Sequence, residues 1–217
     1  MQQNKLTVIG VTGITGSGTS TVSAILAERG GFVAHADKLA HEAMAKSEPA
    51  YKEILAAFGR EILSENGEIN RRVLGTKVFG SKADLEKLEK IIHPRVIERT
   101  NKMIEKITES DSHAFAVIDA PLLTESNLHK ICDSIWLVTA PDALRISRIT
   151  ARDNIDDNAA IRRLQSRAGG DAPLREHANI IIQNDGSPIA LRSKIETVLK
   201  AMSLRKFGWD GLDVLEI

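Results

Sequence analysis

The sequence has few of the residues and segments that mark secreted, membrane-spanning or nucleic-acid-binding proteins. Cys132 is the only cysteine among 217 residues, which excludes an intramolecular disulfide and a cysteine-cluster metal site. No stretch approaches the roughly 18 consecutive apolar residues of a membrane-spanning helix. Lys plus Arg and Asp plus Glu number 29 each, so a zero net charge gives no electrostatic reason to expect nucleic acid or a membrane as the main partner. With no apolar signal segment before the first predicted strand, we expect a cytoplasmic protein.

The most informative stretch that is present is a glycine-rich turn near the start of the chain. Residues 7–12 are apolar and β-branched, as in a buried strand, and residues 20–29 have the periodicity of a helix. Between them, Gly13, Gly16 and Gly18 lack the Cβ atoms that would keep backbone amides away from a phosphate. The helix that follows adds partial positive charge at its N-terminus. The stretch therefore predicts a phosphate-binding loop, or, as the plainer alternative, a glycine turn that only connects two elements.

The spacing from Gly13 to Ser20 is that of the pattern G-x-x-x-x-G-K-[ST], with one departure. Thr19 occupies the lysine position. Ser20 falls where a hydroxyl ligates Mg²⁺. We therefore expect a phosphate and magnesium site that lacks one cation.

A second strand, centred on residues 32–34, follows the first helix and leads to Asp37. Strand, helix and strand at this spacing predict a parallel βαβ unit, in which ligands gather at the carboxyl ends of the strands. Asp37 lies at such an end, near the phosphate loop. Its alternative role is the N-cap of a helix that begins at Lys38.

From residue 38 to about 108 helical periodicities replace strand signals, which predicts a helical insertion. His93-Pro94 is expected to close one helix before Val96 opens the next. Arg71 is a candidate anion contact, although adjacent arginines on a helix often form only a solvated face. His93 is a candidate substrate ligand or base, with a purely structural role as the alternative.

The strand pattern returns in the second half of the chain. Residues 114–119 end in Asp119, an acid that can orient magnesium-bound water, and residues 134–138 predict another strand. Six arginines between residues 145 and 167 surround a polar turn, as in a flap over phosphates or in an exposed helical hairpin. A last strand at 178–182 and a closing helix at 189–202 complete the pattern.

Taken together, the chain resembles the dephospho-coenzyme A kinase family over nearly its whole length. The resemblance rests on a collinear set of short motifs. They are residues 10–21, 37–41, 67–74, 93–94, 121–123, Arg148, 152–153 and Asn184. It implies an α/β fold with a P-loop three-layer α/β/α core and a five-stranded parallel sheet. The implied core is 1–37, 109–150 and 168–217, with a helical substrate domain at 38–108 and a lid at 151–167.

The same resemblance implies roles for individual residues. Asp37 would accept the proton of the ribose 3′-hydroxyl, and Arg152 would reach the phosphates from the lid. The expected ATP contacts are Gly13, Gly16, Ser17, Gly18, Thr19, Ser20, Thr21 and Arg148. The expected magnesium contacts are Ser20 and Asp119, and the expected substrate contacts are Asp37, Arg71 and His93. The departures from the family pattern are Thr19, Thr124, Arg167 and Gln183.

The implied function is ATP- and Mg²⁺-dependent phosphorylation of the ribose 3′-hydroxyl of dephospho-coenzyme A, a small-molecule substrate. Two alternatives stay open on the sequence. One is a non-catalytic or weakly active homologue that binds a nucleotide or coenzyme A and regulates or scaffolds a partner, which Thr19 favours. The other is a kinase of the same core that acts on a different hydroxyl substrate.

Overall fold

The computed structural model describes residues 6–165, 170–204 and 214–217. The chain divides into two compact units, which we name the core unit, Met1–Ala34 with Ile107–Ile217, and the helical unit, His35–Lys106. The helical range expected from the sequence was 38–108. Across the part of the chain that is described, no helix has the length and apolar character needed to cross a membrane.

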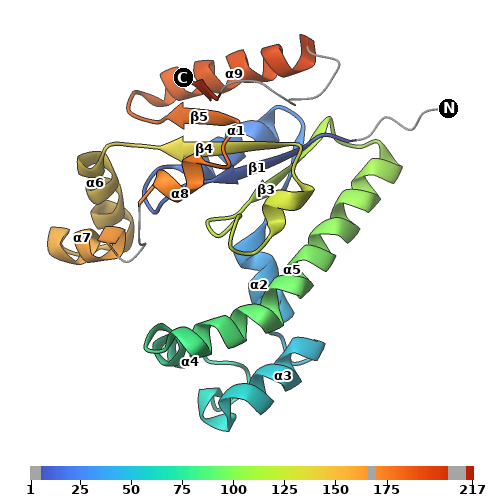
Figure 1. Cartoon of the computed structure of the whole chain (residues 1–217), viewed down its shortest axis with the longest axis vertical. Helices are drawn as coiled ribbons and strands as arrows, with labels where there is room; N and C mark the ends of the chain where they lie inside the picture. The colour runs from blue at the N-terminus through green and yellow to red at the C-terminus, as the bar shows by residue number, and fades with distance from the viewer. Residues whose placement is uncertain (1–5, 166–169, 205–213) are drawn as a thin grey trace. The chain divides into compact units, whose positions relative to one another are not determined.

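The core unit carries the strands and most of the helices that pack on them (Figure 1). Its strands are β1 Val8–Thr12, β2 Gly31–His35 (whose last residue belongs to the helical unit), β3 Phe115–Asp119, β4 Ser134–Thr139, β5 Ile180–Gln183 and β6 Leu215–Glu216. Its helices are α1 Thr19–Glu28, η2 Leu128–Ile131, α6 Asp142–Asp153, α7 Asp157–Gln165, α8 Ala172–Arg175 and α9 Pro188–Leu204. Two helices flanking a polar turn are therefore confirmed at 142–165.

The strands form one sheet in the order β2-β3-β1-β4-β5-β6. The pairs β1/β3, β1/β4, β4/β5 and β5/β6 are parallel. Every residue of β1, β3 and β4 is buried, as expected for parallel strands that are covered on both faces. The expected α/β fold is confirmed, but the count of five strands is wrong. The tail adds β6, because Leu215 N donates to Asn179 O and Gln183 N to Ile217 O along the outer edge of β5.

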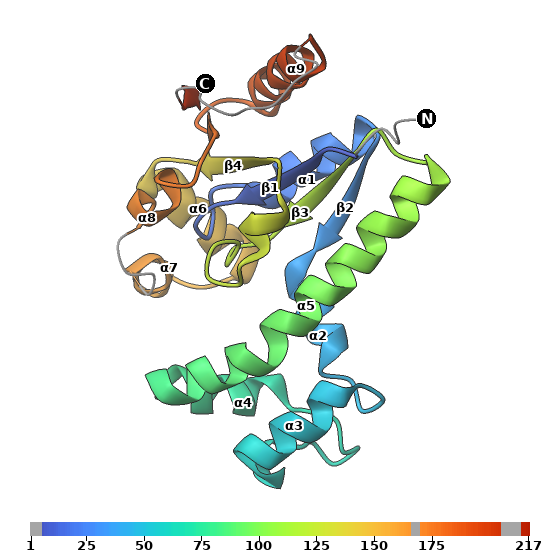
Figure 2. The same cartoon turned by 45° about the vertical axis from the view of Figure 1, so that its right-hand side comes forward.

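Two apolar clusters hold helices against the sheet. On one face, side chains of α1 and α9 pack against alternate residues of the strands. These buried residues are Ile9, Val11, Val22, Ile25, Leu26, Phe115, Val117, Trp136, Val138, Ile180, Ile182, Leu191, Ile195 and Val198. On the other face, Leu174 of α8 packs with Leu137 and Ile181. Figure 2 shows α1 behind the strands, which together with α8 gives the expected three-layer arrangement.

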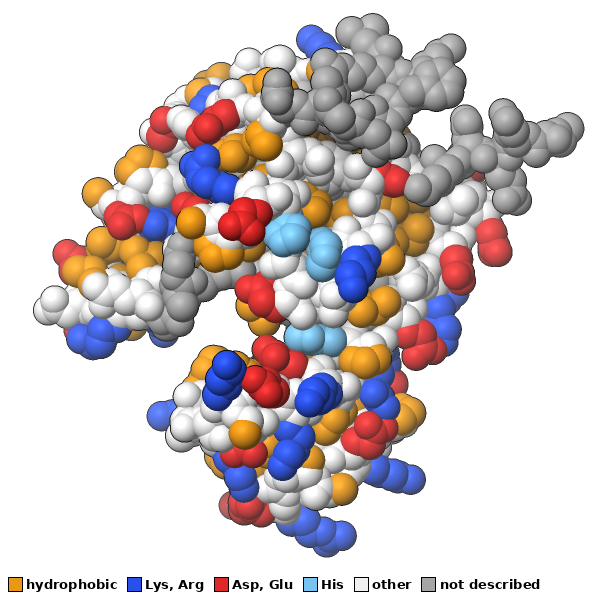
Figure 3. All heavy atoms as spheres, in the orientation of Figure 1, with side chains coloured by type: hydrophobic (Ala, Val, Ile, Leu, Met, Phe, Trp, Pro, Cys, Tyr) orange, Lys and Arg blue, Asp and Glu red, His pale blue; other side chains and the backbone are white. Residues whose placement is uncertain are grey.

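The helical unit has no strand of its own among its described residues, only an isolated antiparallel bridge between Leu63 and Ile69. Its elements are α2 Ala36–Ala43, α3 Pro49–Phe58, η1 Arg60–Ile62, α4 Arg71–Phe79 and the first part of α5 Lys82–Ser110. Asn70 caps α4, because its Oδ1 accepts from the amides of Arg72 and Val73 at 3.1 and 3.2 Å. Figure 3 shows basic and acidic side chains interspersed over this unit, in keeping with the balanced charge of the chain.

The expected break at His93-Pro94 is wrong. Pro94 lies inside the 29-residue helix α5. Proline has no N–H for the carbonyl four residues earlier and normally kinks or ends a helix. Here Ile92 and Val96 are buried on the two sides of Pro94. Apolar packing on both sides therefore offsets the loss of one helical hydrogen bond.

Candidate active site

The glycine-rich turn joins β1 directly to α1, and each of its glycines has a physical reason. Gly16 and Gly18 have positive φ angles of 83° and 100°, which side chains rarely adopt. A Cβ on Gly13 would lie 2.5 Å from the backbone oxygen of Val138 and 2.6 Å from the Oγ of Ser17. Any side chain at these positions would therefore strain or displace the loop.

Helix α1 begins at Thr19, with Gly18 as its N-cap and without a side-chain cap. Its first-turn residues Ser20 and Thr21 are exposed, whereas Ser17 is buried. The Ser17 hydroxyl has no hydrogen-bond partner in the structure. An uncapped helix N-terminus next to a glycine loop is the arrangement that binds phosphate in proteins.

Two residues from distant parts of the chain contact the carbonyl groups of this loop. Arg148 on α6 donates through Nη1 to the backbone oxygens of Gly16 and Ser17, at 3.3 Å each. Asn184, which follows β5, donates through Nδ2 to the Ser17 oxygen at 2.8 Å. The resemblance implied that Arg148 contacts ATP, and it included Asn184 only as part of a motif. Nothing in the local sequence indicates that either side chain meets the loop.

Asp119 is the last residue of β3 and is buried. Its register partner on β1 is Val11, so it lies at the edge of the sheet from which the loop departs. In the described part of the chain no group of three or more His, Cys, Asp or Glu side chains could hold a metal ion by itself. Any divalent cation here would therefore need the Ser20 hydroxyl or phosphate oxygens among its ligands.

Arg152 ends α6 in an ion pair with its neighbour. Its Nε and Nη2 donate to Asp153 Oδ1 and Oδ2 at 2.8 and 2.9 Å, and Arg163 of α7 contacts the same carboxylate. The hydrogen bond from Arg152 lowers the pKa of Asp153, so this carboxylate is charged at neutral pH. Sixty per cent of the Arg152 side chain is exposed, so its charge is accessible to an anionic ligand.

Arg145, also on α6, was expected only as one of six arginines around the polar turn, without a contact to the loop. A Cβ on Gly16 would lie 2.9 Å from the Arg145 backbone oxygen, so the loop rests directly on α6 at this residue. The Arg145 side chain is 9% exposed and pairs with Asp142 and with Asp171, the latter at 3.7 Å from Nη1. The contact depends on how α6 packs, which local sequence does not reveal.

Three predicted residues belong to the helical unit. Asp37 lies exposed in the first turn of α2, two residues after the end of β2. The alternative that it caps this helix is wrong, because His35 occupies the N-cap position. His93 lies in the middle of α5.

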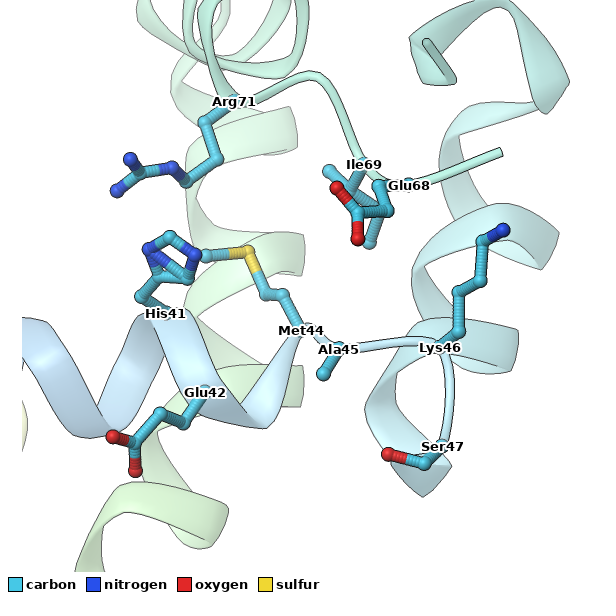
Figure 4. Close-up of a pocket in the computed structure, with 9 residues that line it drawn as sticks. All are labelled: His41, Glu42, Met44, Ala45, Lys46, Ser47, Glu68, Ile69 and Arg71. Atoms are coloured by element: carbon cyan, nitrogen blue, oxygen red, sulfur yellow. The ribbon is translucent and has the colours of Figure 1, made fainter. Parts of the chain in front are cut away.

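Arg71, at the start of α4, lines a cavity of about 440 Å³ in this unit. Figure 4 shows Arg71, His41 and Met44 facing the same space, with Glu68 across from them and Glu42 directed to the other side of α2. The lining of the cavity thus combines basic, acidic and apolar side chains, which are His41, Lys46 and Arg71, Glu42 and Glu68, and Met44, Ala45 and Ile69.

In the core unit, the structure brings together the loop, Arg148 and Asp119, on elements that are far apart in sequence. Arg167 lies outside the described residues.

This geometry agrees with comparisons to known proteins. Residues 7–189 match the family model described as dephospho-CoA kinase. The chain belongs to the dephospho-CoA kinase family. The dephospho-CoA kinase of Carboxydothermus hydrogenoformans is 36% identical over 198 residues, which cover 90% of this chain and 94% of that protein. That of Moorella thermoacetica is 37% identical over 188 residues, covering 87% and 88%.

Solved structures agree with this membership. The dephospho-CoA kinase of Campylobacter jejuni superposes with a TM-score of 0.64 at 26% identity, covering 92% of this chain and 98% of that one. A Thermus thermophilus protein superposes with a TM-score of 0.77 at 28% identity, covering 94% and 100%. A shikimate kinase of Acinetobacter baumannii, 17% identical with a TM-score of 0.51, shares the fold. The chain is thus a kinase with the P-loop fold, as the sequence predicted.

Proposed function

We propose that the protein transfers the γ-phosphoryl group of ATP to the ribose 3′-hydroxyl of dephospho-coenzyme A, the last step of coenzyme A synthesis. The observation that carries the proposal is the glycine loop between β1 and α1. It is supported by relatives that are named dephospho-CoA kinase and that align with most of this chain. We place this reaction in the cytoplasm. The chain has a single cysteine and so needs no oxidising compartment for an internal disulfide, and the proposed reaction uses ATP.

The core unit would bind the nucleotide. Residues Gly16 to Thr21 and the N-terminal end of α1 would surround the phosphates, and Ser20 with Asp119 would hold Mg²⁺. The ion would neutralise charge on the β- and γ-phosphates. Such sites act mainly by positioning and by charge neutralisation, so the missing lysine at Thr19 lowers the rate without removing the site.

The helical unit would bind the acceptor. The cavity would offer the Arg71 guanidinium and the His41 imidazole to a diphosphate, and apolar contacts from Met44 and Ile69 to the arm attached to it. His93 would contact the substrate as well. Asp37 would take the proton from the attacking hydroxyl, which an exposed carboxylate can do.

The segment 151–167 would act as the lid. The pair between Arg152 and Asp153 is exposed, and exposed ion pairs are weak. A polyphosphate can therefore compete with Asp153 for Arg152. Closure over ATP would exclude water, which would otherwise take the phosphoryl group.

A coupled assay of ADP release tests the proposal. With ATP and Mg²⁺ held saturating, dephospho-coenzyme A should give turnover well above the rate without an acceptor. Adenosine and shikimate serve as comparison acceptors that also offer hydroxyl groups. Turnover with another hydroxyl acceptor but not with dephospho-coenzyme A, or ATP binding with no turnover at all, would contradict it.

A further inference from the structure

We infer that Arg148 and Asn184 together form a clamp on the carbonyl side of the phosphate loop and are positioning residues for the nucleotide. The clamp fixes the Ser17 carbonyl so that the Gly18 amide faces the phosphates. The inference rests on the proposed function only for the identity of the ligand, because the contacts themselves lie wholly within the core unit.

The clamp is made of side-chain donors and loop carbonyls. Arg148 Nη1 lies 3.3 Å from the backbone oxygens of both Gly16 and Ser17. Asn184 Nδ2 lies 2.8 Å from the Ser17 oxygen, in a buried contact. The Ser17 carbonyl therefore accepts from two side chains that are more than 130 residues away in sequence.

The two clamp residues also hold each other. Arg148 Nη2 donates to the Asn184 backbone oxygen at 3.0 Å and to Oδ1 at 3.4 Å. The Asn184 amide donates to the Thr139 oxygen at 2.7 Å, which ties the clamp to the end of β4. Asn184 is only 7% exposed. Closed and partly buried networks of this kind restrict the conformations of the groups they contact.

Because a peptide group is planar, fixing the direction of a carbonyl also fixes the direction of the N–H group in the same peptide. In a trans peptide the C=O group and the following N–H group point in opposite directions within one plane. Fixing the Ser17 carbonyl toward Asn184 therefore directs the Gly18 N–H to the opposite side of the loop. A Cβ on Gly18 would lie 2.2 Å from Asn184 Nδ2, so a glycine is needed for this approach.

The contacts also assign Arg148 to the loop instead of to the phosphates. Its two Nη atoms donate to four acceptors, all of which belong to the loop or to Asn184. A guanidinium can bind several acceptors in fixed directions, whereas an ammonium acts as a point charge. Lysine at 148 would keep the positive charge and lose the clamp.

The test uses Arg148→Lys, Asn184→Ala and the double variant in the full chain, with the Kd for MgATP and for inorganic pyrophosphate measured by calorimetry. Each single variant should raise both Kd values about tenfold or more, as expected when a buried carbonyl loses its donor. The Kd values of the double variant should be little higher than those of the single variant that binds more weakly, because the two residues act as one unit. KM for dephospho-coenzyme A should stay within twofold.

Asn179→Ala is the matched control. Asn179 precedes β5, and its Oδ1 accepts from the Ile135 amide at 2.8 Å, so its loss removes a similar bond far from the loop. It should lower the melting temperature and leave both Kd values unchanged. If Asn184→Ala does not fold, the Kd values of Arg148→Lys alone test the clamp.

Unchanged Kd values in Arg148→Lys would overturn the clamp, since charge alone would then suffice. Equal losses in Asn179→Ala would do so too, since a general loss of stability would then explain the effect. Weakened pyrophosphate binding in a protein that fails to phosphorylate dephospho-coenzyme A would support the clamp and contradict the proposed function. Unchanged Kd values in both single variants of an enzyme that phosphorylates dephospho-coenzyme A would contradict the clamp and support the proposed function.

Discussion

Thr19, the first residue of α1, stands where a phosphate-binding loop normally carries lysine. Its hydroxyl is neutral and is too short to reach the position of a lysine ammonium. The glycines, the helix N-terminus and Ser20 are independent of that side chain. Binding of phosphate should therefore persist, while the rate of transfer should depend on the missing cation.

The substitution Thr19→Lys tests this. Restoring the cation should raise kcat by up to about 10²–10³-fold, the range typical of one preorganised donor. Steady-state kinetics with ATP and magnesium varied in parent and variant provide the measurement. A parent activity that lysine does not improve would show that other groups already supply the charge.

Asp37 is the residue on which proton acceptance depends in the proposed reaction. Asp37→Asn keeps the size of the side chain and abolishes proton acceptance, so kcat should fall by about 10²–10⁴-fold. Because Asp37 is exposed, the melting temperature should change little. Turnover within a few-fold of the parent, measured in the coupled assay, would exclude it as the base.

Among the elements, α6 carries Arg152, which is expected to move from Asp153 to the phosphates of ATP. Arg152→Ala should lower kcat at least tenfold with a change in melting temperature of only a few degrees, because the side chain is mostly exposed and its pair with Asp153 is weak. Thermal unfolding and kinetics on the same preparation separate the two effects. A clear loss of stability with unchanged kinetics would identify a structural hairpin.

Helix α5 offers a test of how packing overrides local preference. Pro94→Ala restores an N–H donor inside the helix and should raise the free energy of unfolding by about 1 kcal/mol or more, measured by urea denaturation. Pro49→Ala is the control, because Pro49 opens α3, where an N–H would have no helical partner. An equal rise in the two variants, or a fall in Pro94→Ala, would contradict the explanation.

These elements also show how much the sequence could predict. β1, β3 and β4 are apolar throughout, so their positions follow from local pattern. β6 has only two residues and depends on pairing with β5, which no local pattern contains. The loop followed from glycine spacing, whereas its contacts with Arg148 and Asn184 depend on how α6 and β5 approach it.

At the scale of the whole molecule, the two units carry different parts of the proposed reaction. The core unit holds the loop and Asp119, and the helical unit holds Asp37 and the cavity at Arg71. Phosphoryl transfer requires the attacking and leaving oxygens in line, so both substrates must be held together. The product formed when both substrates are present therefore tests the proposed reaction.

Direct analysis of that product is the most direct test. The protein, Mg²⁺, γ-labelled ATP and dephospho-coenzyme A are incubated, and the product is separated and examined by mass spectrometry and ³¹P NMR. The account predicts label in a monoester on the ribose 3′-oxygen, in amounts equal to the ADP released. Label found only in inorganic phosphate, or no label transfer from bound ATP, would contradict it.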